Sequence, residues 1–459
     1  MTRSPDGTGW IYALFLGLLL WAPVPLGSNR PWSWALLEVG VLLLGVAWLV
    51  GFARGRFDAG PVLIGAWPAA ACFAVWLAYV WLQLLPLPIE LLRLVSPESA
   101  RWHVAASVPD ALSFAPLTLD RHGTLDAACK STAYFVYFLL ALVLLQDRDR
   151  VRLATYAVIL SGTFQALYGA FSSLQGGGLA AAGTFVNRNH YAAYMVMCLS
   201  VGIGVLMASL SGTRYRSWGE FFREAVQWVI TPKMGLRLLL VAMVIALVLT
   251  RSRMGNGSFF ISLFATGVIG LLLSKHATKS MVLLLVSLIA IDVFIVGAYF
   301  GTQRVVESIG HTTLQTEDRD EVAGYALRMW RDFPVFGSGL GSFPVVFPRY
   351  SAEGTLESYT HAHNDYLELA AETGLLGIGL LGLLVLFSFA AALRAQQLRK
   401  DPVMRGISFA AMMGIIALMI HSAVDFNLQI PANALTFMLL LAFAWASRHC
   451  SEGKAQPGD

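Results

Sequence analysis

Long apolar stretches follow one another along almost the whole chain, and they constrain its fold more than any other feature. A helix that crosses a bilayer needs about 20 mostly apolar residues, and by that measure we expect about twelve spans. They are 9–27, 33–52, 62–86, 126–145, 152–172, 190–210, 236–250, 256–274, 280–300, 373–393, 405–425 and 431–447. Only 13% of the residues are charged, about half of what soluble domains carry. The sequence therefore predicts an all-α integral membrane protein.

Lysine and arginine residues gather in alternate short loops, which predicts how the chain is oriented in the membrane. The basic loops contain Arg54 and Arg56, then Arg148, Arg150 and Arg152, then Arg214, Arg216 and Arg223, then Lys275 and Lys279, then Arg394, Arg399 and Lys400. We place these loops and both termini in the cytoplasm. The loops 87–125, 173–189 and 301–372 then face the opposite side.

This orientation divides the chain into three parts. Residues 1–300 contain about nine transmembrane helices, residues 301–372 form a long periplasmic catalytic loop, and residues 373–459 contain about three helices and a short cytoplasmic tail. A loop as long as 301–372 is usually functional or disordered, and its many aromatic and proline residues argue against disorder.

Within that loop, a helix is expected from Asp318-Arg319 to Asp332, followed by Pro334, which ends it. The turn Gly337-Ser338-Gly339-Leu340-Gly341 comes next. Its backbone would be able to approach a ligand closely, although a plain connecting turn explains the glycines equally well. The apolar stripe of the helix is expected at Val322, Ala326, Met329 and Phe333.

The segment His361-Ala362-His363-Asn364-Asp365-Tyr366 is the main candidate for chemistry. Asp365 and Glu368 have the spacing of a capping box with Asp365 as the N-cap, which would give both acids a purely structural role. A helix would then begin here, and His363 would lie just ahead of its positive end. That end favours an anion and a neutral imidazole. We expect His363 to be a base that activates a hydroxyl against a phosphorylated donor.

Metal binding is the alternative for the same segment, because His361, His363 and Asp365 would make a plausible ligand set. We favour a site with no metal and no cofactor. The four cysteines occur singly and form no Cys-x-x-Cys pair, so a metal cluster or a disulfide framework is not expected.

Two arginines are expected to complete the site. Arg253 interrupts an apolar stretch, and charges at membrane depth usually pair or bind a ligand. Together with Arg319 it would clamp a diphosphate, because a guanidinium matches phosphate oxygens in a bidentate way. Ion pairs with nearby acids are the alternative for both. Asp425 follows His421 by about one helical turn, and from spacing alone we favour a structural bond between them.

Several motifs, in order, resemble those of the bacterial O-antigen ligase and O-antigen polymerase superfamily. The region from Arg319 to Gly377 resembles the signature region through Arg319, Arg328-Met329-Trp330-Arg331-Asp332-Phe333-Pro334, His363-Asn364-x-x-Leu367 and Glu372-x-Gly374-x-x-Gly377. Further similar stretches are Ser252-Arg253-x-Gly255, Gly183-Thr184-Phe185-x-Asn187-Arg188-Asn189-His190 and Val424-Asp425-Phe426-Asn427-Leu428. The resemblance covers essentially the whole chain and does not separate ligases from polymerases.

The resemblance implies a GT-C-like membrane glycosyltransferase with its active site on the periplasmic face of the bacterial inner membrane. The donor would be a glycan on undecaprenyl diphosphate, and the acceptor would be lipid A-core or a second glycan. Membrane lipids would surround the protein, and no nucleic acid would bind it. His363 would be the base, while Arg253 and Arg319 would hold the leaving diphosphate. Further substrate-binding candidates are Asn364, Arg328, His361, Asn187, Arg188, His190 and Asp425.

One departure from the family pattern is His361-Ala362, where ligases often have a small residue before the His-Asn pair. The extra histidine keeps the metal alternative open. Other functions also remain to be tested. A polysaccharide or lipid-linked glycan transporter usually places polar residues at the membrane midplane, often in inverted repeats, whereas here they gather at the outer rim. A scaffold protein would not depend on His363.

Overall fold

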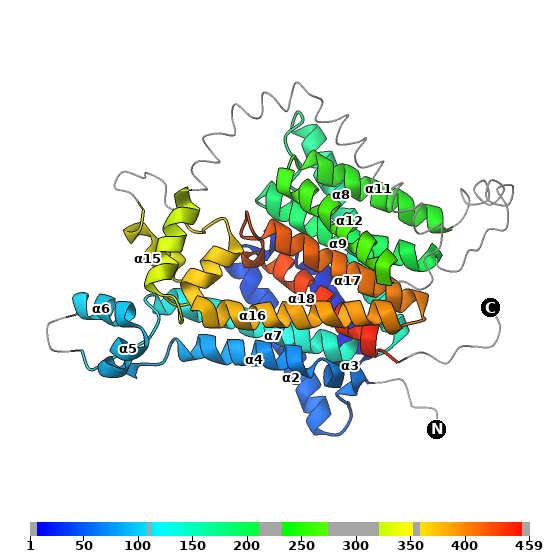
Figure 1. Ribbon diagram of the computed structural model, residues 1–459. Coiled ribbons are helices and arrows are strands. Elements are labelled where there is room, and N and C mark those ends of the chain that lie inside the picture. The colour runs from blue at the N-terminus through cyan, green and yellow to red at the C-terminus, as the bar shows by residue number, and fades with distance from the viewer. Residues whose placement is uncertain (1–6, 108–111, 211–231, 274–320, 352–358, 452–459) are drawn as a thin grey trace.

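The computed structural model describes residues 7–107, 112–210, 232–273, 321–351 and 359–451 (Figure 1). The longer helices are α1 (Gly9–Trp21), α2 (Pro31–Ala53), α4 (Trp67–Leu82), α7 (Arg121–Leu144), α8 (Arg148–Gln175), α9 (Arg188–Leu210), α11 (Pro232–Leu249), α12 (Arg253–Leu273), α16 (Asp365–Leu398), α17 (Pro402–His421) and α18 (Pro431–His449). The shorter ones are η1 (Leu26–Ser28), α3 (Gly60–Gly65), α5 (Ile89–Val95), α6 (Pro97–Ala105), α15 (Phe343–Val346), η3 (Phe347–Arg349) and η4 (Asn427–Gln429). Strands β1 (Leu87–Pro88) and β2 (Phe114–Ala115) pair antiparallel.

Seven of the described helices are long and apolar enough to cross a membrane, namely α2, α7, α8, α9, α12, α16 and α17. The apolar helices α1, α4 and α11 are shorter. The architecture is that of an all-α, multi-pass membrane protein. Every expected span except 280–300, which lies outside the described residues, coincides with helical structure.

One expected boundary was wrong. The stretch 62–86 is not one helix, because α3 ends at Gly65 and α4 starts at Trp67, where Pro68 lacks the N–H that a continuous helix needs. The span expected from residue 373 is part of α16, which begins at Asp365, beside His363, where the sequence predicted a helix start. In the long loop, residues 321–332 are helical and the expected stripe is buried, which confirms that prediction over the described part.

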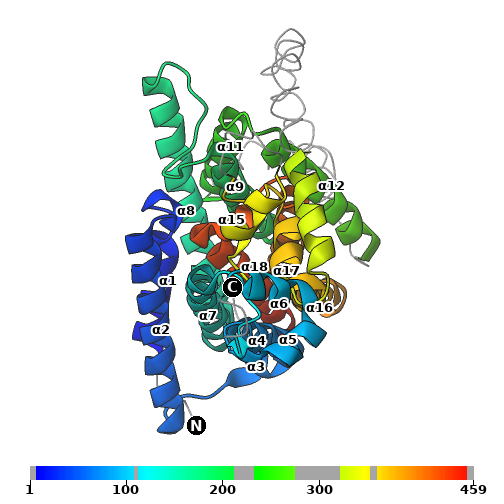
Figure 2. The same cartoon turned by 90° about the vertical axis from the view of Figure 1, so that its left-hand side faces the viewer.

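Helices α17 and α18 lie at the centre of the bundle (Figures 1 and 2). α9 and α12 pack on one side of this pair, and α7 and α4 complete the other side together with α16. Residues 431–447 of α18 are all buried. α9 and α17 approach closely at Gly204 and Gly406, where a Cβ on either residue would lie 2.3 Å from the other's carbonyl oxygen. Small residues at such crossings are typical of helix packing in membranes.

One end of the bundle carries α5, α6, α15 and the start of α16, and we call it the site end (Figure 1). There α16 is interrupted at Gly374, whose φ of 63° and ψ of −170° are not helical. The segment 334–339 fills the interruption. The amides of Leu375 and Leu376 donate to the carbonyls of Pro334 and Val335, at 2.9 and 3.2 Å. In return, the amides of Ser338 and Gly339 donate to the carbonyls of Ala371 and Glu372, at 3.0 and 2.9 Å.

The end of α4 supplies the remaining polar partners. The Gln83 side chain is buried, and its amide group donates to the carbonyls of Phe336 and Glu372 at 3.2 and 3.3 Å. Its carbonyl accepts from the amide of Leu340 at 3.0 Å. Tyr79 also donates to the carbonyl of Phe336. Buried backbone groups need such partners, so α4 and the segment 334–340 fix the direction of the first part of α16.

The glycine at position 374 gives a stability test. A Cβ there would lie 2.2 Å from the carbonyl carbon of Val335, and its φ of 63° is unfavourable for other residues. We expect Gly374→Ala to destabilise the protein by roughly 1–3 kcal/mol, seen as a lower midpoint in thermal unfolding of the detergent-solubilised chain. Gly379→Ala, in the same helix with open space around it, is the control. Equal midpoints for the two variants would contradict this interpretation.

Candidate functional site

The first turn of α16 is capped by Asn364 and not by Asp365. The Asn364 side-chain oxygen accepts from the amides of Tyr366 and Leu367, at 3.0 and 3.1 Å. The capping box expected from Asp365 and Glu368 was therefore wrong. Asn364 has an extended backbone, as an N-cap requires, whereas Asp365 is already helical. His363 does lie just ahead of the helix, as predicted, and it adopts an unusual φ of 50°.

Because Asn364 caps the helix, the two carboxyl groups are available for other contacts. Asp365 is buried and accepts from the amide of Leu428 at 3.1 Å, while its own amide donates to the carbonyl of Ser422 at 2.9 Å. Glu368 accepts from the amide of Ala362 at 2.7 Å and from the side chain of Gln429 at 3.1 Å. These bonds fasten the start of α16 to the segment 422–430, which connects α17 to α18.

That connecting segment places Asp425 among histidines. The buried Asp425 carboxylate lies 3.5 Å from Nε2 of His190, which is on α9, and 3.7 Å from Nδ1 of His363. Burial by itself would raise the Asp425 pKa, but the neighbouring His190 and His363, with a further contribution from His421, lower it below its ordinary value. The structural bond between Asp425 and His421 that spacing favoured is not among these contacts, and His421 acts on the Asp425 pKa through its charge. The carboxylate stays ionised and faces several imidazoles.

Phe426 separates the imidazoles into two groups. Its ring meets those of His190 and His363 edge-on, with centroids 4.5 and 5.0 Å apart. On His361 it is stacked, with centroids 4.3 Å apart and an interplanar angle of 19°. No local pattern distinguishes Phe426 from the neighbouring residues of its motif. Two histidines of the loop before α16 and one histidine of α9 therefore contact the same aromatic ring.

His361 has a partner of its own. Its Nδ1 lies 2.8 Å from a carboxylate oxygen of Glu368. The three residues considered as metal ligands thus have separate neighbours: Glu368 for His361, Asp425 for His363, and the Leu428 amide for Asp365. Within the described ranges, no three histidine, cysteine or acidic side chains are placed to share a metal ion.

The other predicted substrate-binding residues lie in different parts of the structure, and their contacts differ. Asn187 accepts from the amide of Asn189 at 2.8 Å and so helps to start α9, a local structural role. Arg188 begins α9 and Arg253 begins α12, and both are exposed. The guanidinium of the exposed Arg328 lies over the Tyr325 ring, 4.5 Å from its centroid. Arg319 lies outside the described residues.

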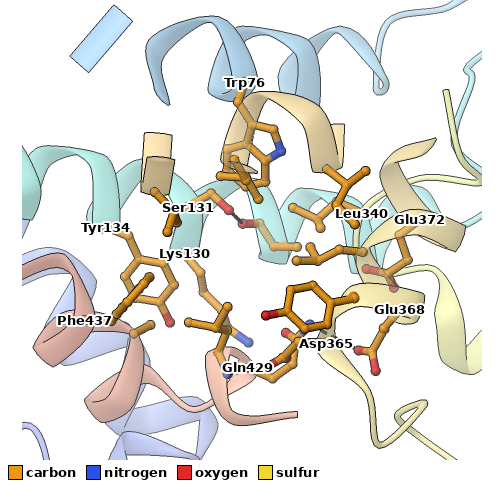
Figure 3. Close-up of a pocket in the computed structure, with 18 of the residues that line it drawn as sticks. Trp76, Lys130, Ser131, Tyr134, Leu340, Asp365, Glu368, Glu372, Gln429 and Phe437 are labelled. Carbon is orange, nitrogen blue, oxygen red and sulfur yellow. Dashed lines mark hydrogen bonds between the residues drawn. The ribbon is translucent and has the colours of Figure 1, made fainter. Parts of the chain in front are cut away.

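A cavity of about 860 Å³ opens beside the site and was not expected from the sequence (Figure 3). Residues from α4, α7, α16, α17 and α18 line it, and most of them are apolar. The polar lining side chains are Asp126, Lys130, Ser131, Tyr134, Thr360, His361, Asp365, Tyr366, Glu368, Glu372 and Gln429. His361 and its partner Glu368 therefore face this cavity. Lys130 was not predicted to belong to a site. A single lysine in an apolar helix is as typical of a membrane anchor as of a binding site, so its position in the sequence does not distinguish the two.

Comparison with protein families gives a match to the O-Antigen ligase family over residues 238–381. Just under a third of the chain is thus similar to this family. The match confirms the family resemblance drawn from the motifs. The matched part includes Arg253, Arg319, Arg328, His361, His363 and Asn364. No curated protein matches the chain.

The cap gives the test for this site. We expect Asn364→Ala to lower the stability of the protein by about 1 kcal/mol, because two amides at the start of α16 lose their acceptor. Asn364→Ser is the matched control, because serine also caps helices. Thermal unfolding in detergent measures both. If both variants unfold at the wild-type temperature, Asn364 does not act as the cap.

Proposed function

We propose that this protein transfers a glycan from undecaprenyl diphosphate to a sugar hydroxyl at the periplasmic face of the bacterial inner membrane. The observation that supports this most is the position of His363, inside the family-matched segment and beside the buried Asp425 carboxylate at 3.7 Å. A base that is oriented by a carboxylate is a recurring arrangement for activating a hydroxyl. A carboxylate on the Nδ1 side favours the tautomer with its proton on Nδ1, which leaves Nε2 to accept a proton.

In the proposed reaction, the acceptor hydroxyl oxygen attacks the anomeric carbon of the donor sugar and forms a new glycosidic bond. The bond from that carbon to the diphosphate oxygen breaks, and the anomeric centre is inverted. His363 takes the hydroxyl proton, and undecaprenyl diphosphate leaves with the bonding electrons. Arg253 and Arg319 offset the negative charge on the diphosphate, as guanidinium groups do for phosphates. The step requires no metal and no cofactor.

The acceptor distinguishes the two reactions within this superfamily. A ligase transfers the glycan to lipid A-core, whereas a polymerase transfers it to a second lipid-linked glycan. We place ligase activity first. A transporter would move the lipid-linked glycan and form no new glycosidic bond.

The role of His363 is tested with purified protein and undecaprenyl-diphosphate-linked glycan, offered first with lipid A-core and then with a second lipid-linked glycan. We expect product from the wild type and a loss of at least about 100-fold for His363→Ala, the usual range for removing a general base. His103→Ala, on α6, is the control for loss of a histidine as such. Absence of product with either acceptor, from folded protein, would contradict the proposal and favour a transporter or a scaffold.

The role of Arg253 is tested by a substitution that preserves charge. We expect Arg253→Lys to lower kcat/KM by about 10- to 100-fold, because lysine cannot form the bidentate pair with a diphosphate. Arg251→Lys is the matched control, since Arg251 is exposed and donates to the carbonyl of Gly178 at 2.8 Å, which a lysine is able to do. Turnover of Arg253→Lys at the wild-type rate would show that Arg253 does not clamp the diphosphate.

A further inference from the structure

The cavity lies on the other side of the central helices from Arg253, one of the two arginines predicted to hold the diphosphate. Arg253 begins α12 and Arg188, a further substrate-binding candidate, begins α9, and both helices pack on one side of α17 (Figure 1). The cavity is lined by residues of α4, α7, α16, α17 and α18. Neither arginine contributes to its lining, and His363 and Asp425 do not either. Phe426 contacts both the His361 ring, which lines the cavity, and the His363 ring, which does not.

The chemistry of the lining changes along the cavity. Glu368 and Glu372 lie at one end, with His361 bonded to Glu368 (Figure 3). The Oε2 atom of Glu372 is buried and has no hydrogen-bond partner among the described residues. At the opposite end the labelled side chains are the rings of Tyr134 and Phe437. Leu381, Val385 and Phe389 on α16 extend the apolar wall away from the site end.

Lys130 lies between these two ends (Figure 3). It is seven residues beyond Gly123 on α7, which places it about 10 Å deeper along the helix axis. Its ammonium lies over the Trp34 ring, 3.7 Å from the centroid. Glu38 and Asp126 act electrostatically on this ammonium, but neither lies within 4.0 Å of it to form an ion pair in the described part of the chain. A charge at this depth usually marks a binding site.

The order along the cavity is therefore carboxyl groups, one cation, and an apolar wall. Carboxylates accept hydrogen bonds from hydroxyl groups. A lysine ammonium binds phosphate as a point charge, and an apolar wall binds hydrocarbon. A glycolipid whose phosphates are carried by the sugars nearest its hydrocarbon chains, with further sugars beyond them, presents these groups in the same order. A polyprenyl diphosphate matches the cavity less well, because it brings two phosphates to one lysine and several carboxyl groups.

We propose that this cavity binds the acceptor of the reaction, a phosphate-bearing glycolipid, with its phosphate on Lys130. The proposal rests on the function proposed above and assigns the second substrate to a separate compartment. The hydrocarbon chains lie along α16, and the sugar hydroxyls contact Glu372 and the pair His361–Glu368. The reacting hydroxyl then reaches the edge of Phe426, next to His363. Two lipid substrates thus enter from opposite sides of the central helices.

Equilibrium binding in nanodiscs, with no donor present, tests the assignment of the phosphate. The probes are lipid A and lipid A without its phosphates. We expect Lys130→Gln to weaken lipid A binding by about 10- to 100-fold, the range for a charge-assisted hydrogen bond. Lys130→Arg, which keeps the charge, should stay within about threefold of the wild type, and so should Lys400→Gln, at an exposed residue far from the cavity. Dephosphorylated lipid A should bind wild type and Lys130→Gln equally weakly.

A second variant tests the path of the hydrocarbon chains. Val385→Trp fills the apolar wall without changing any charge, and we expect it to weaken lipid A binding while the melting temperature stays close to that of the wild type. Equal binding of lipid A by wild type, Lys130→Gln and Val385→Trp would overturn the proposal. So would a loss confined to undecaprenyl-diphosphate-linked glycan, which would make the cavity the donor site.

These measurements separate the failure of this inference from the failure of the proposed function. Lipid A binding that depends on Lys130, in a protein that forms no product with any acceptor, would support the cavity assignment and contradict the transferase. Transfer by the wild type that is unaffected by Lys130→Gln, at acceptor concentrations below KM, would contradict the cavity assignment alone.

Discussion

The exchange of backbone hydrogen bonds between α16 and the segment 334–339 is the interaction on which the site end depends. The helical backbone hydrogen bonds of α16 are interrupted at Gly374. The segment 334–339 supplies two donors and two acceptors in their place. Gly337 makes the approach possible, because a Cβ there would lie 2.2 Å from the carbonyl carbon of Glu372. In a low-dielectric surrounding such bonds are costly to break. The direction of the first part of α16, and with it the position of His363, follows from this insertion.

The same turn also brings distant residues to one place. The start of α16 is fastened to the segment between α17 and α18, and that segment presents Asp425 to a histidine from α9 and a histidine from the loop before α16. The bond from the Leu428 amide satisfies a buried carboxyl oxygen of Asp365, and the Asp425 carboxylate places its charge 3.5 and 3.7 Å from the two imidazoles. Phe426 then divides the imidazoles between two compartments. A reaction between two lipid-linked substrates fits such a division, because each lipid is able to remain in the bilayer while its head group reaches the common edge.

Charge is distributed unevenly between the compartments. The cavity side has several carboxyl groups and one lysine, whereas the α9 and α12 side has arginines at two helix starts. Arginine recognises phosphate oxygens in pairs, while carboxylates accept from hydroxyl groups. Because of this difference, our proposals place the diphosphate on the α9 and α12 side and the sugar hydroxyl on the cavity side. The match to the O-antigen ligase family is consistent with both assignments and does not by itself distinguish donor from acceptor.

The sequence by itself determined the all-α membrane class, nearly all helix locations, and the family resemblance of the region around His363, because apolar length and motif order are properties of the linear chain. It did not determine which polar residue caps α16, since Asn364 and Asp365 are both good N-caps and only the burial of Asp365 against the segment 422–430 decides between them. Nor did it indicate that Asp425 would face His190 and His363, or that Lys130 would enter a cavity. Those contacts join residues that are far apart in sequence and form only when the helices pack together. A local sequence pattern therefore cannot predict them.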